Sequence, residues 1–203
     1  MTGKPKQLRG AAAREKLVDV AAELFYTNGV RATGVDEVVR RSGMAKASLY
    51  RWFPNKDDLI LAVLDKRDEV FWAAWDETAR RHPGPREELD AQLARIQQLA
   101  TRDGYRGCAF VNTAAEFDVG QAAIRARCLR HEEELRRRLR ALTARLEVAD
   151  SERLADQLHV AIVGAFAVGG VYPTGGPAHH LLDLAAVLLR AAEPASTTEP
   201  GNR

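Results

Sequence analysis

Apolar and polar positions follow a helical period along most of the chain. The segment 11–28 places Leu17, Leu24 and Phe25 on one face and stops at Gly29, a residue that readily ends a helix. Proline, glycine and short polar runs separate six later segments, at roughly 56–81, 86–102, 106–117, 121–147, 152–172 and 178–192. No segment shows the strict alternation of a strand. With two short helices between 33 and 52, the pattern predicts an all-α chain of about nine helices.

The two short helices lie between Arg31 and Lys56 and are joined by a tight turn. We expect the first helix to start after Thr33, whose hydroxyl is placed to cap its first amides while Asp36 stands at the third helical position. Gly43 then allows the sharp turn between the helices. This is the arrangement of a helix-turn-helix DNA reader.

The second short helix, 44–52, is predicted to pack through Leu49 and, just beyond it, Phe53. Its open side is then formed by small, hydroxylated and cationic residues, which suit a major groove. These residues are Lys46, Ala47, Ser48, Tyr50 and Arg51.

The order and spacing of these residues resemble the DNA-binding domain of the TetR family of bacterial regulators, over roughly the first sixty residues. The matching positions are Phe25, Gly29, Thr33, Gly43, Leu49, Tyr50, Phe53 and Lys56. Two positions depart from the family pattern. Ala45 stands where a serine usually caps the recognition helix, and Trp52 stands where a histidine is common. The missing cap is expected to cost about 1 kcal/mol.

The resemblance implies an N-terminal three-helix reader followed by a larger helical domain for ligand binding and dimerisation. It implies a homodimeric transcriptional regulator, most often a repressor, that binds an inverted-repeat operator in double-stranded DNA and is released by a small molecule. By the same resemblance, Thr33, Tyr50 and Lys56 contact phosphate. The base edges or adjacent phosphates are met by Lys46, Ala47, Ser48 and Arg51.

The predicted domain division is a disordered basic tail at 1–10, the reader at 11–56, the second domain at 57–193 and a disordered tail at 194–203. Charge agrees with a basic N-terminal end: residues 1–60 hold eleven Lys/Arg against seven Asp/Glu, in a chain of 203 residues with formal net charge +2. A basic end can neutralise DNA phosphates, but a surface that only faces solvent has the same composition. The uninterrupted segment 56–81 is expected to act as a lever between the two domains.

The last two helices, 152–172 and 178–192, are apolar on several sides, which predicts burial against more than one neighbour. We expect them to form a four-helix bundle with the same helices of a second copy; burial within one subunit is the alternative. The dimer-interface candidates are Ala161, Gly164, Ala165, Val168, Leu181, Leu184 and Leu188.

A small-molecule effector implies an internal pocket, whose candidate lining residues are Phe71, Trp72, Trp75, Cys108, Phe110, Asn112, Glu116, His159 and Phe166. Aromatic residues at helical spacing also serve as plain core. Asn112 and Glu116 are four apart and are expected to face inward together, where an acid requires a cationic partner. A structural salt bridge explains Glu116 equally well.

The sequence gives little support to other classes of function. The N-terminus has no apolar run, and no stretch approaches the length of a membrane span, so we expect a cytoplasmic protein that does not enter a membrane. Cys108 and Cys128 are expected to be reduced thiols, with a redox switch as the lesser alternative. No catalytic residues, metal site or cofactor are predicted, because phosphate-loop, nucleophile-elbow and HExxH motifs are all missing. A helical interaction module or a small-molecule enzyme without DNA affinity remains the alternative.

Overall fold

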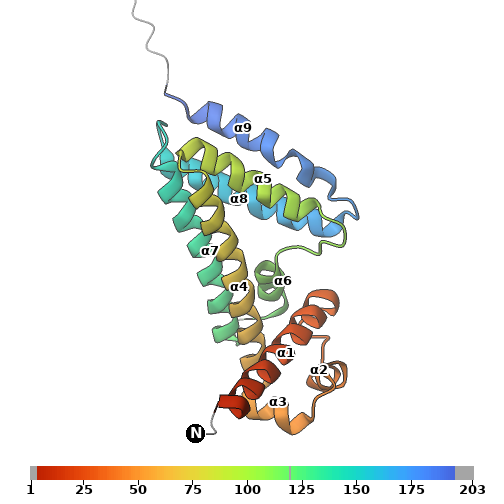
Figure 1. Ribbon diagram of the computed structural model, residues 1–203. Helices are drawn as coiled ribbons and strands as arrows, with labels where there is room; N and C mark the ends of the chain where they lie inside the picture. Colours follow the sequence, from red (N-terminus) through yellow and green to blue (C-terminus); the bar gives the residue numbers. More distant parts are fainter. Residues whose placement is uncertain (1–3, 119, 195–203) are drawn as a thin grey trace, which may run out of the picture. The chain divides into compact units, whose positions relative to one another are not determined.

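The computed structural model describes residues 4–118 and 120–194, with side chains from Gly10 onward. Across these residues the chain forms α-helices and one 3-10 helix and contains no strand (Figure 1). The predicted all-α fold is therefore confirmed. In chain order the elements are α1 (Lys4–Asn28), α2 (Val35–Ser42), α3 (Lys46–Trp52), α4 (Lys56–Arg81), α5 (Pro85–Thr101), α6 (Ala109–Glu116), α7 (Ala122–Thr143), α8 (Ser151–Val171), η1 (Gly176–His180) and α9 (Leu181–Ala192).

Helix ends account for most differences from the sequence prediction. The first helix begins at Lys4 and not at residue 11, because the segment before Gly10 holds only Pro5 as a helix breaker, and proline is tolerated in a first turn. That part of the predicted disordered tail is helical, whereas residues 1–3 and 195–203 lie outside the described residues. The recognition helix α3 starts at Lys46, two residues later than predicted.

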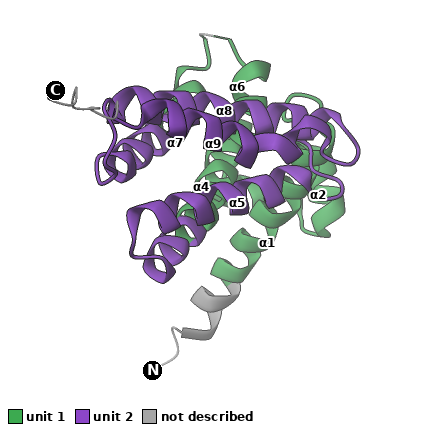
Figure 2. Ribbon diagram, turned by 90° about the horizontal axis from the view of Figure 1, so that it is seen from above, with its two compact units in different colours: residues 1–73, 108–131 green, residues 74–107, 132–203 purple. Residues whose placement is uncertain are grey.

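Two compact units divide the chain, one containing residues 1–73 and 108–131 and the other residues 74–107 and 132–203 (Figure 2). Helices α4 and α7 each contribute residues to both units. The predicted boundaries separate a DNA reader from a second domain, whereas the two units are defined by compactness. The predicted domain division therefore stays a prediction.

The first unit has a hydrophobic core to which the three N-terminal helices and the later helices both contribute. From α1 to α4 the core takes Leu17, Leu24, Phe25, Val38, Leu49, Leu59, Ile60 and Leu64, with Phe53 between α3 and α4. From α6, α7 and the connection between them it takes Phe110, Phe117, Ile124 and Cys128. The predicted burial of Leu49 and Phe53 is confirmed, since they are 1% and 2% exposed.

In the second unit, α5, α8, η1 and α9 pack on one another. Gly169 of α8 lies so close to α5 that a side chain there would overlap the carbonyl oxygen of Ala100. Close approach of two helix backbones is the usual reason for a glycine inside a helix. The small residues of α8 therefore serve packing within the subunit on at least this face.

Helix α8 is also the one described helix whose length and composition are those of a membrane span. The sequence expectation that no segment approaches such a span does not hold by this measure, because alanine, glycine, valine and other apolar residues fill α8 from Val160 onward. A core helix of a globular protein meets the same criterion, and α8 packs against α5, η1 and α9.

Candidate nucleic-acid interface

Helices α1, α2 and α3 contact one another and form the predicted helix-turn-helix. The turn between α2 and α3 depends on Gly43, which has a φ of +67° and whose amide donates to the carbonyl of Arg40. This left-handed conformation is costly for residues with a side chain, so the predicted role of Gly43 is confirmed.

Thr33 does not cap α2, and that prediction is wrong. Gly34 occupies the capping position, without a side-chain hydrogen bond. The buried hydroxyl of Thr33 instead donates to the carbonyl oxygens of Gly29 (2.8 Å) and Leu24 (3.3 Å), at the end of α1. The reason is that the unpaired carbonyls of one helix end compete for the same hydroxyl as the free amides of the next helix start. The hydroxyl of Thr33 thus faces the protein and not a phosphate.

The recognition helix α3 lacks a side-chain cap, as the sequence predicted. Ala45 occupies the capping position with φ −71° and ψ 141°, and no side chain bonds to the first amides of α3. Its carbonyl accepts from the amide of Ser48 at 2.9 Å. The backbone is therefore already in the conformation that a capping serine would need.

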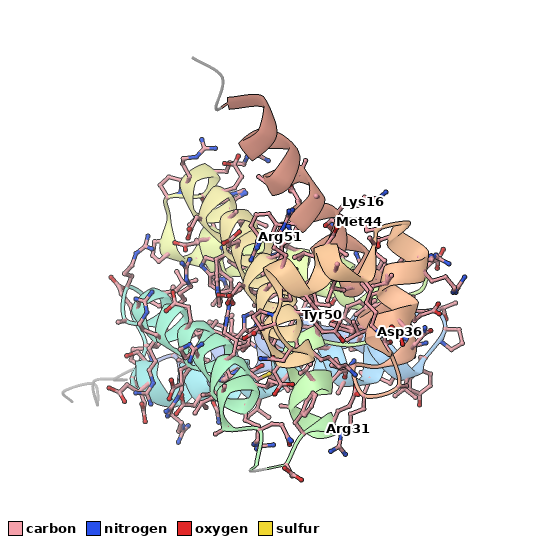
Figure 3. All side chains as sticks on the ribbon, turned by 90° about the horizontal axis from the view of Figure 1, so that it is seen from below. Lys16, Arg31, Asp36, Met44, Tyr50 and Arg51 are labelled. Atoms are coloured by element: carbon pink, nitrogen blue, oxygen red, sulfur yellow. The ribbon has the colours of Figure 1, made fainter. Side chains whose placement is uncertain are left out.

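The predicted reading surface is turned outward. Lys46, Ala47 and Arg51 are exposed, Tyr50 is 43% exposed, and Ser48 is half-buried. Figure 3 shows Tyr50 and Arg51 on this side of the first unit, with Asp36 and Met44 near them.

Lys46 does not stand alone on this surface, because its Nζ atom lies 2.6 Å from a carboxylate oxygen of Asp36 on α2. The hydrogen bond with Asp36 raises the pKa of Lys46. Both side chains are largely exposed, so the pair contributes little to stability. It does place a negative charge beside the surface that is predicted to meet DNA.

Lys56 lies at the start of α4, where its Nζ atom donates to the carbonyl oxygen of Arg31 at 3.3 Å. Partial burial lowers the pKa of Lys56, and the nearby carboxylate of Glu116 opposes that shift. One of its three donor hydrogens is engaged in this bond, which leaves the ammonium group able to bind a phosphate as well.

Two exposed cations of the first unit, Lys16 of α1 and Arg31 of the loop after α1, were not among the predicted site residues, and Figure 3 labels both in the view that shows Tyr50 and Arg51. Their charge was visible in the basic balance of residues 1–60. Their location was not visible in the sequence, because helical spacing alone does not determine which exposed face of α1 lies on the same side as α3.

Several predicted pocket residues of the first unit gather around a histidine that the sequence prediction did not include. The buried His131 of α7 stacks on Phe110, with ring centroids 3.7 Å apart, and contacts Phe71 and Trp72 edge-on or tilted. Its Nδ1 atom lies 2.7 Å from a carboxylate oxygen of Asp68.

Asp68 is the polar centre of this cluster. Its carboxylate accepts from Trp72 Nε1 at 2.8 Å and pairs with Arg127 at 2.8 Å. Burial lowers the pKa of Arg127, but hydrogen bonds to Asp65 and Asp68 outweigh that effect and raise it. Buried charges matched in this way are an ordinary structural network.

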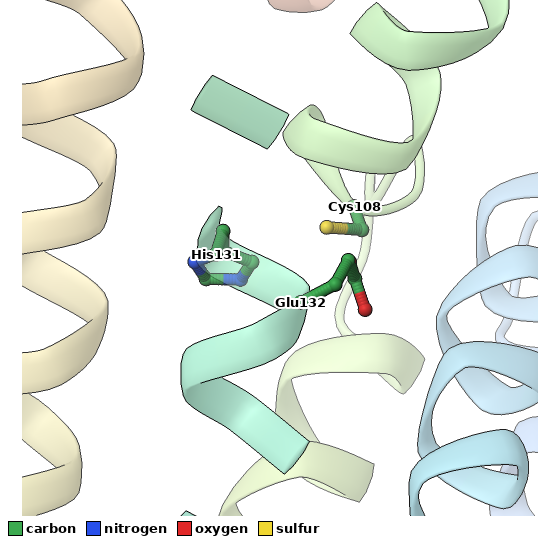
Figure 4. A group of neighbouring side chains, drawn as sticks. All are labelled: Cys108, His131 and Glu132. Carbon is green, nitrogen blue, oxygen red and sulfur yellow. The ribbon is translucent and has the colours of Figure 1, made fainter. Parts of the chain in front are cut away.

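Cys108 lies immediately before α6, and its side chain faces the ring of His131 on α7 (Figure 4). Glu132 is the next residue of α7. Neither Cys108 nor Cys128 forms a disulfide. The cysteine sulfur, a ring nitrogen of His131 and a carboxylate oxygen of Glu132 lie within 4.8 Å of one another. Two of these three groups already have protein partners, since the imidazole of His131 pairs with Asp68 and the carboxylate of Glu132 pairs with His159 at 2.8 Å.

Asn112 and Glu116 of α6 do not face the interior together, so that prediction is wrong. Asn112 is exposed and Glu116 is half-buried. The carboxylate of Glu116 accepts hydrogen bonds from the backbone amides of Val30 (3.0 Å) and Arg31 (2.6 Å). The four-residue spacing does place two side chains on one face, but it does not determine which way that face points.

The remaining pocket candidates belong to the second unit. Trp75 and Phe166 are buried, and the backbone of Trp75 accepts from the side chain of Gln92 at 2.8 Å. Phe166 lies 6.1 Å from the ring of Tyr105, and His159 pairs with Glu132 at 2.8 Å. These residues have core and surface partners that account for them without a ligand.

The predicted dimer residues on α8 and α9 divide between two faces. Ala165 and Leu181 are buried within the subunit and are therefore unavailable to a partner. Gly164 and Leu184 are exposed, whereas Ala161, Val168 and Leu188 are half-buried. Three exposed valines that the prediction missed extend the apolar surface: Val160 (74%), Val171 (78%) and Val187 (52%).

A family model described as "Bacterial regulatory proteins, tetR family" matches residues 17–63. A crystal structure of a TetR-family transcriptional regulator from Streptomyces coelicolor superposes with a TM-score of 0.85 at 28% identity, over 91% of this chain and 97% of that one. The transcriptional regulator AcuR of Cereibacter sphaeroides is 28% identical over 82% of this chain and 77% of its own length.

CifR, a TetR-family regulator crystallised with a 26-bp double-strand operator DNA, is 21% identical with a TM-score of 0.74, over 86% of this chain and 94% of that one. Its likeness therefore concerns the fold. In three other curated regulators the match covers only 28%, 43% and 33% of the relative's length. The matching proteins are transcriptional regulators and not enzymes. On the family model and the reader geometry, residues 17–63 are a DNA-binding domain of the TetR family of bacterial regulatory proteins, and the chain shares the fold of TetR-family transcriptional regulators.

Proposed function

We propose that the protein is a cytoplasmic, homodimeric transcriptional repressor that binds an inverted-repeat operator through α3 and leaves it when a small molecule binds. The observation that carries the proposal is the outward side of α3, where Lys46, Ala47, Tyr50 and Arg51 are exposed on a glycine-turned helix-turn-helix. Cations and small side chains on a short exposed helix are suited to a major groove.

Dimerisation is supported by the open apolar surface of α8 and α9. A shallow groove of about 750 Å³ is lined by residues of both helices, including Val160, Ala161, Leu184 and Leu188. Charged residues, among them Arg153 and Glu152, line the same groove. Apolar residues beside charged ones are compatible with a protein–protein interface. A second copy with twofold symmetry would present two α3 helices to successive major grooves, about 34 to 36 Å apart.

Release by a small molecule is supported by α4, a single helix that contributes to both compact units. A ligand that prefers the form unable to bind DNA would lower operator occupancy tens-fold with a coupling of about 1 to 3 kcal/mol. We expect such a ligand to bind at the aromatic cluster around His131, which contains three of the predicted pocket residues, Phe71, Trp72 and Phe110.

Selection of bound sequences from a random duplex library, at two salt concentrations, tests this function. Enrichment of an inverted repeat, with binding that weakens as salt rises, is the expected result. A folded protein that enriches no sequence at either salt would refute the proposal and favour an interaction module. Repression is then separated from activation with a reporter gene placed behind the selected operator.

A further inference from the structure

The loop that joins α1 to α2, residues 29–34, is held by an acidic side chain from outside the reader. Glu116, the last residue of α6, accepts from the amides of Val30 and Arg31 at 3.0 and 2.6 Å. A carboxylate that accepts from two consecutive amides makes short charge-assisted hydrogen bonds. This contact links α6 directly to the backbone by which the chain enters α2.

The loop itself is built to resist deformation. Gly29 has a φ of +93°, and its carbonyl oxygen accepts from the hydroxyl of Thr33 at 2.8 Å. The side chain of Val30 is buried in the core of the first unit, and the carbonyl of Arg31 accepts from Lys56. Because these bonds fix the loop internally, a pull on its amides would move α2 as a body instead of being absorbed by the loop.

The end of α6 is also fixed on its other side. Phe117, which follows Glu116, lies in the same core as Val30, and the guanidinium of Arg31 lies 5.7 Å from its ring centroid. Arg125 of α7 donates to the carbonyl of Phe117 at 2.9 Å. Glu116 therefore stands between a firmly held helix end and a firmly held loop.

We propose that Glu116 is a positioning residue that couples α6 to the DNA reader, so that a displacement of α6 shifts the entry of α2 and with it the orientation of α3. The inference rests on the proposed function and adds a residue through which that function is regulated. The contact is made to backbone amides, so no side-chain rotation on the reader side can relieve a displacement of Glu116.

Glu116→Gln provides the first test, since it keeps the shape but replaces one acceptor with a donor facing an amide. Simple electrostatics predicts tighter DNA binding, because a negative charge near Lys56 is removed. Positioning predicts the opposite: at least fivefold weaker binding to the operator selected with the wild-type protein. Amide exchange at Val30 and Arg31 should accelerate at least tenfold. Glu133→Gln, which removes the same charge at an exposed position of α7, serves as the control and should do neither.

The salt dependence separates positioning from contact. Glu116 neutralises no phosphate, so the slope of log affinity against log salt should be unchanged in Glu116→Gln. A merely structural role would lower the thermal midpoint and the affinity together, without dependence on the state of α6.

Ala115→Gly addresses that last point, because it weakens α6 at an exposed position next to Glu116. It should weaken operator binding in the wild-type background and have no further effect in the Glu116→Gln background. Equal effects of Ala115→Gly in both backgrounds, or wild-type affinity of Glu116→Gln, would overturn the inference alone. A wild-type protein that selects no operator would overturn the proposed function as well.

Discussion

Replacing Ala45 with serine should stabilise the recognition helix. Ala45 is already at the capping position of α3 with extended φ and ψ, and the amide of Ser48 points back toward it. A serine hydroxyl there can accept from one of the first amides of α3 without any backbone change.

The expected gain in the free energy of unfolding is about 1 kcal/mol, the usual difference between serine and alanine at a helix start. Since Leu49 of α3 is buried in the core of the first unit, this gain should stabilise that unit and not α3 alone. In a protein of this size, 1 kcal/mol corresponds to roughly 2 to 4 °C in the thermal midpoint. Operator affinity should rise by up to about fivefold, because a better-formed α3 loses less order on binding.

Thermal and denaturant unfolding of Ala45→Ser, followed by operator titration, measure both quantities. Ala32→Ser is a matched control, because it adds the same hydroxyl at an exposed turn position outside any helix start. An unchanged midpoint in Ala45→Ser would show that the first amides of α3 are already satisfied and that the cap argument is wrong.

Three further substitutions test other parts of the structure. Gly29→Ala should destabilise the protein by about 1 to 2 kcal/mol because φ is +93°, whereas Gly34→Ala, in open space and with negative φ, should cost only the smaller difference between glycine and alanine at a helix start in the same denaturant titration; equal effects would contradict the strain argument. Asp36→Asn should free Lys46 and steepen the salt dependence of DNA binding by about one unit of slope; an unchanged slope would refute a phosphate role for Lys46. Gly169→Ala should cost about 1 to 3 kcal/mol in unfolding experiments because its methyl group would overlap α5; undiminished stability would contradict that packing.

The helices and the reader were predictable because their signals are local. Apolar spacing and breaker residues determine where helices run, and the exposed side of α3 follows from the burial of Leu49 and Phe53. The competition for Thr33 was not predictable, since the helix end before it and the helix start after it offer equally suitable partners. Only the three-dimensional path of the loop decides between them.

The role of Glu116 could not be predicted from the sequence for a related reason. Its spacing from Asn112 suggested a shared inward face, yet its actual partners, Val30 and Arg31, are 86 and 85 residues away in sequence and contribute backbone atoms. Backbone amides carry no sequence signature. Distance in sequence also hid the cluster around Asp68. Its partners are the side chains of His131 and Arg127, which come from α7.

The core of the first unit bears on how far the reader can be treated as a separate module. Leu49 and Phe53, which position α3, are buried together with Phe110 and Phe117, which lie far beyond the predicted end of the reader at residue 56. Fully burying an aromatic side chain contributes about 1.5 to 3 kcal/mol, so removing these two from the core would withdraw a sizeable share of the stability of a small domain. Hydrophobic burial and the Glu116 contact thus act on the same loop and helices. A change that moves α6 must therefore either move the reader or expose part of its core.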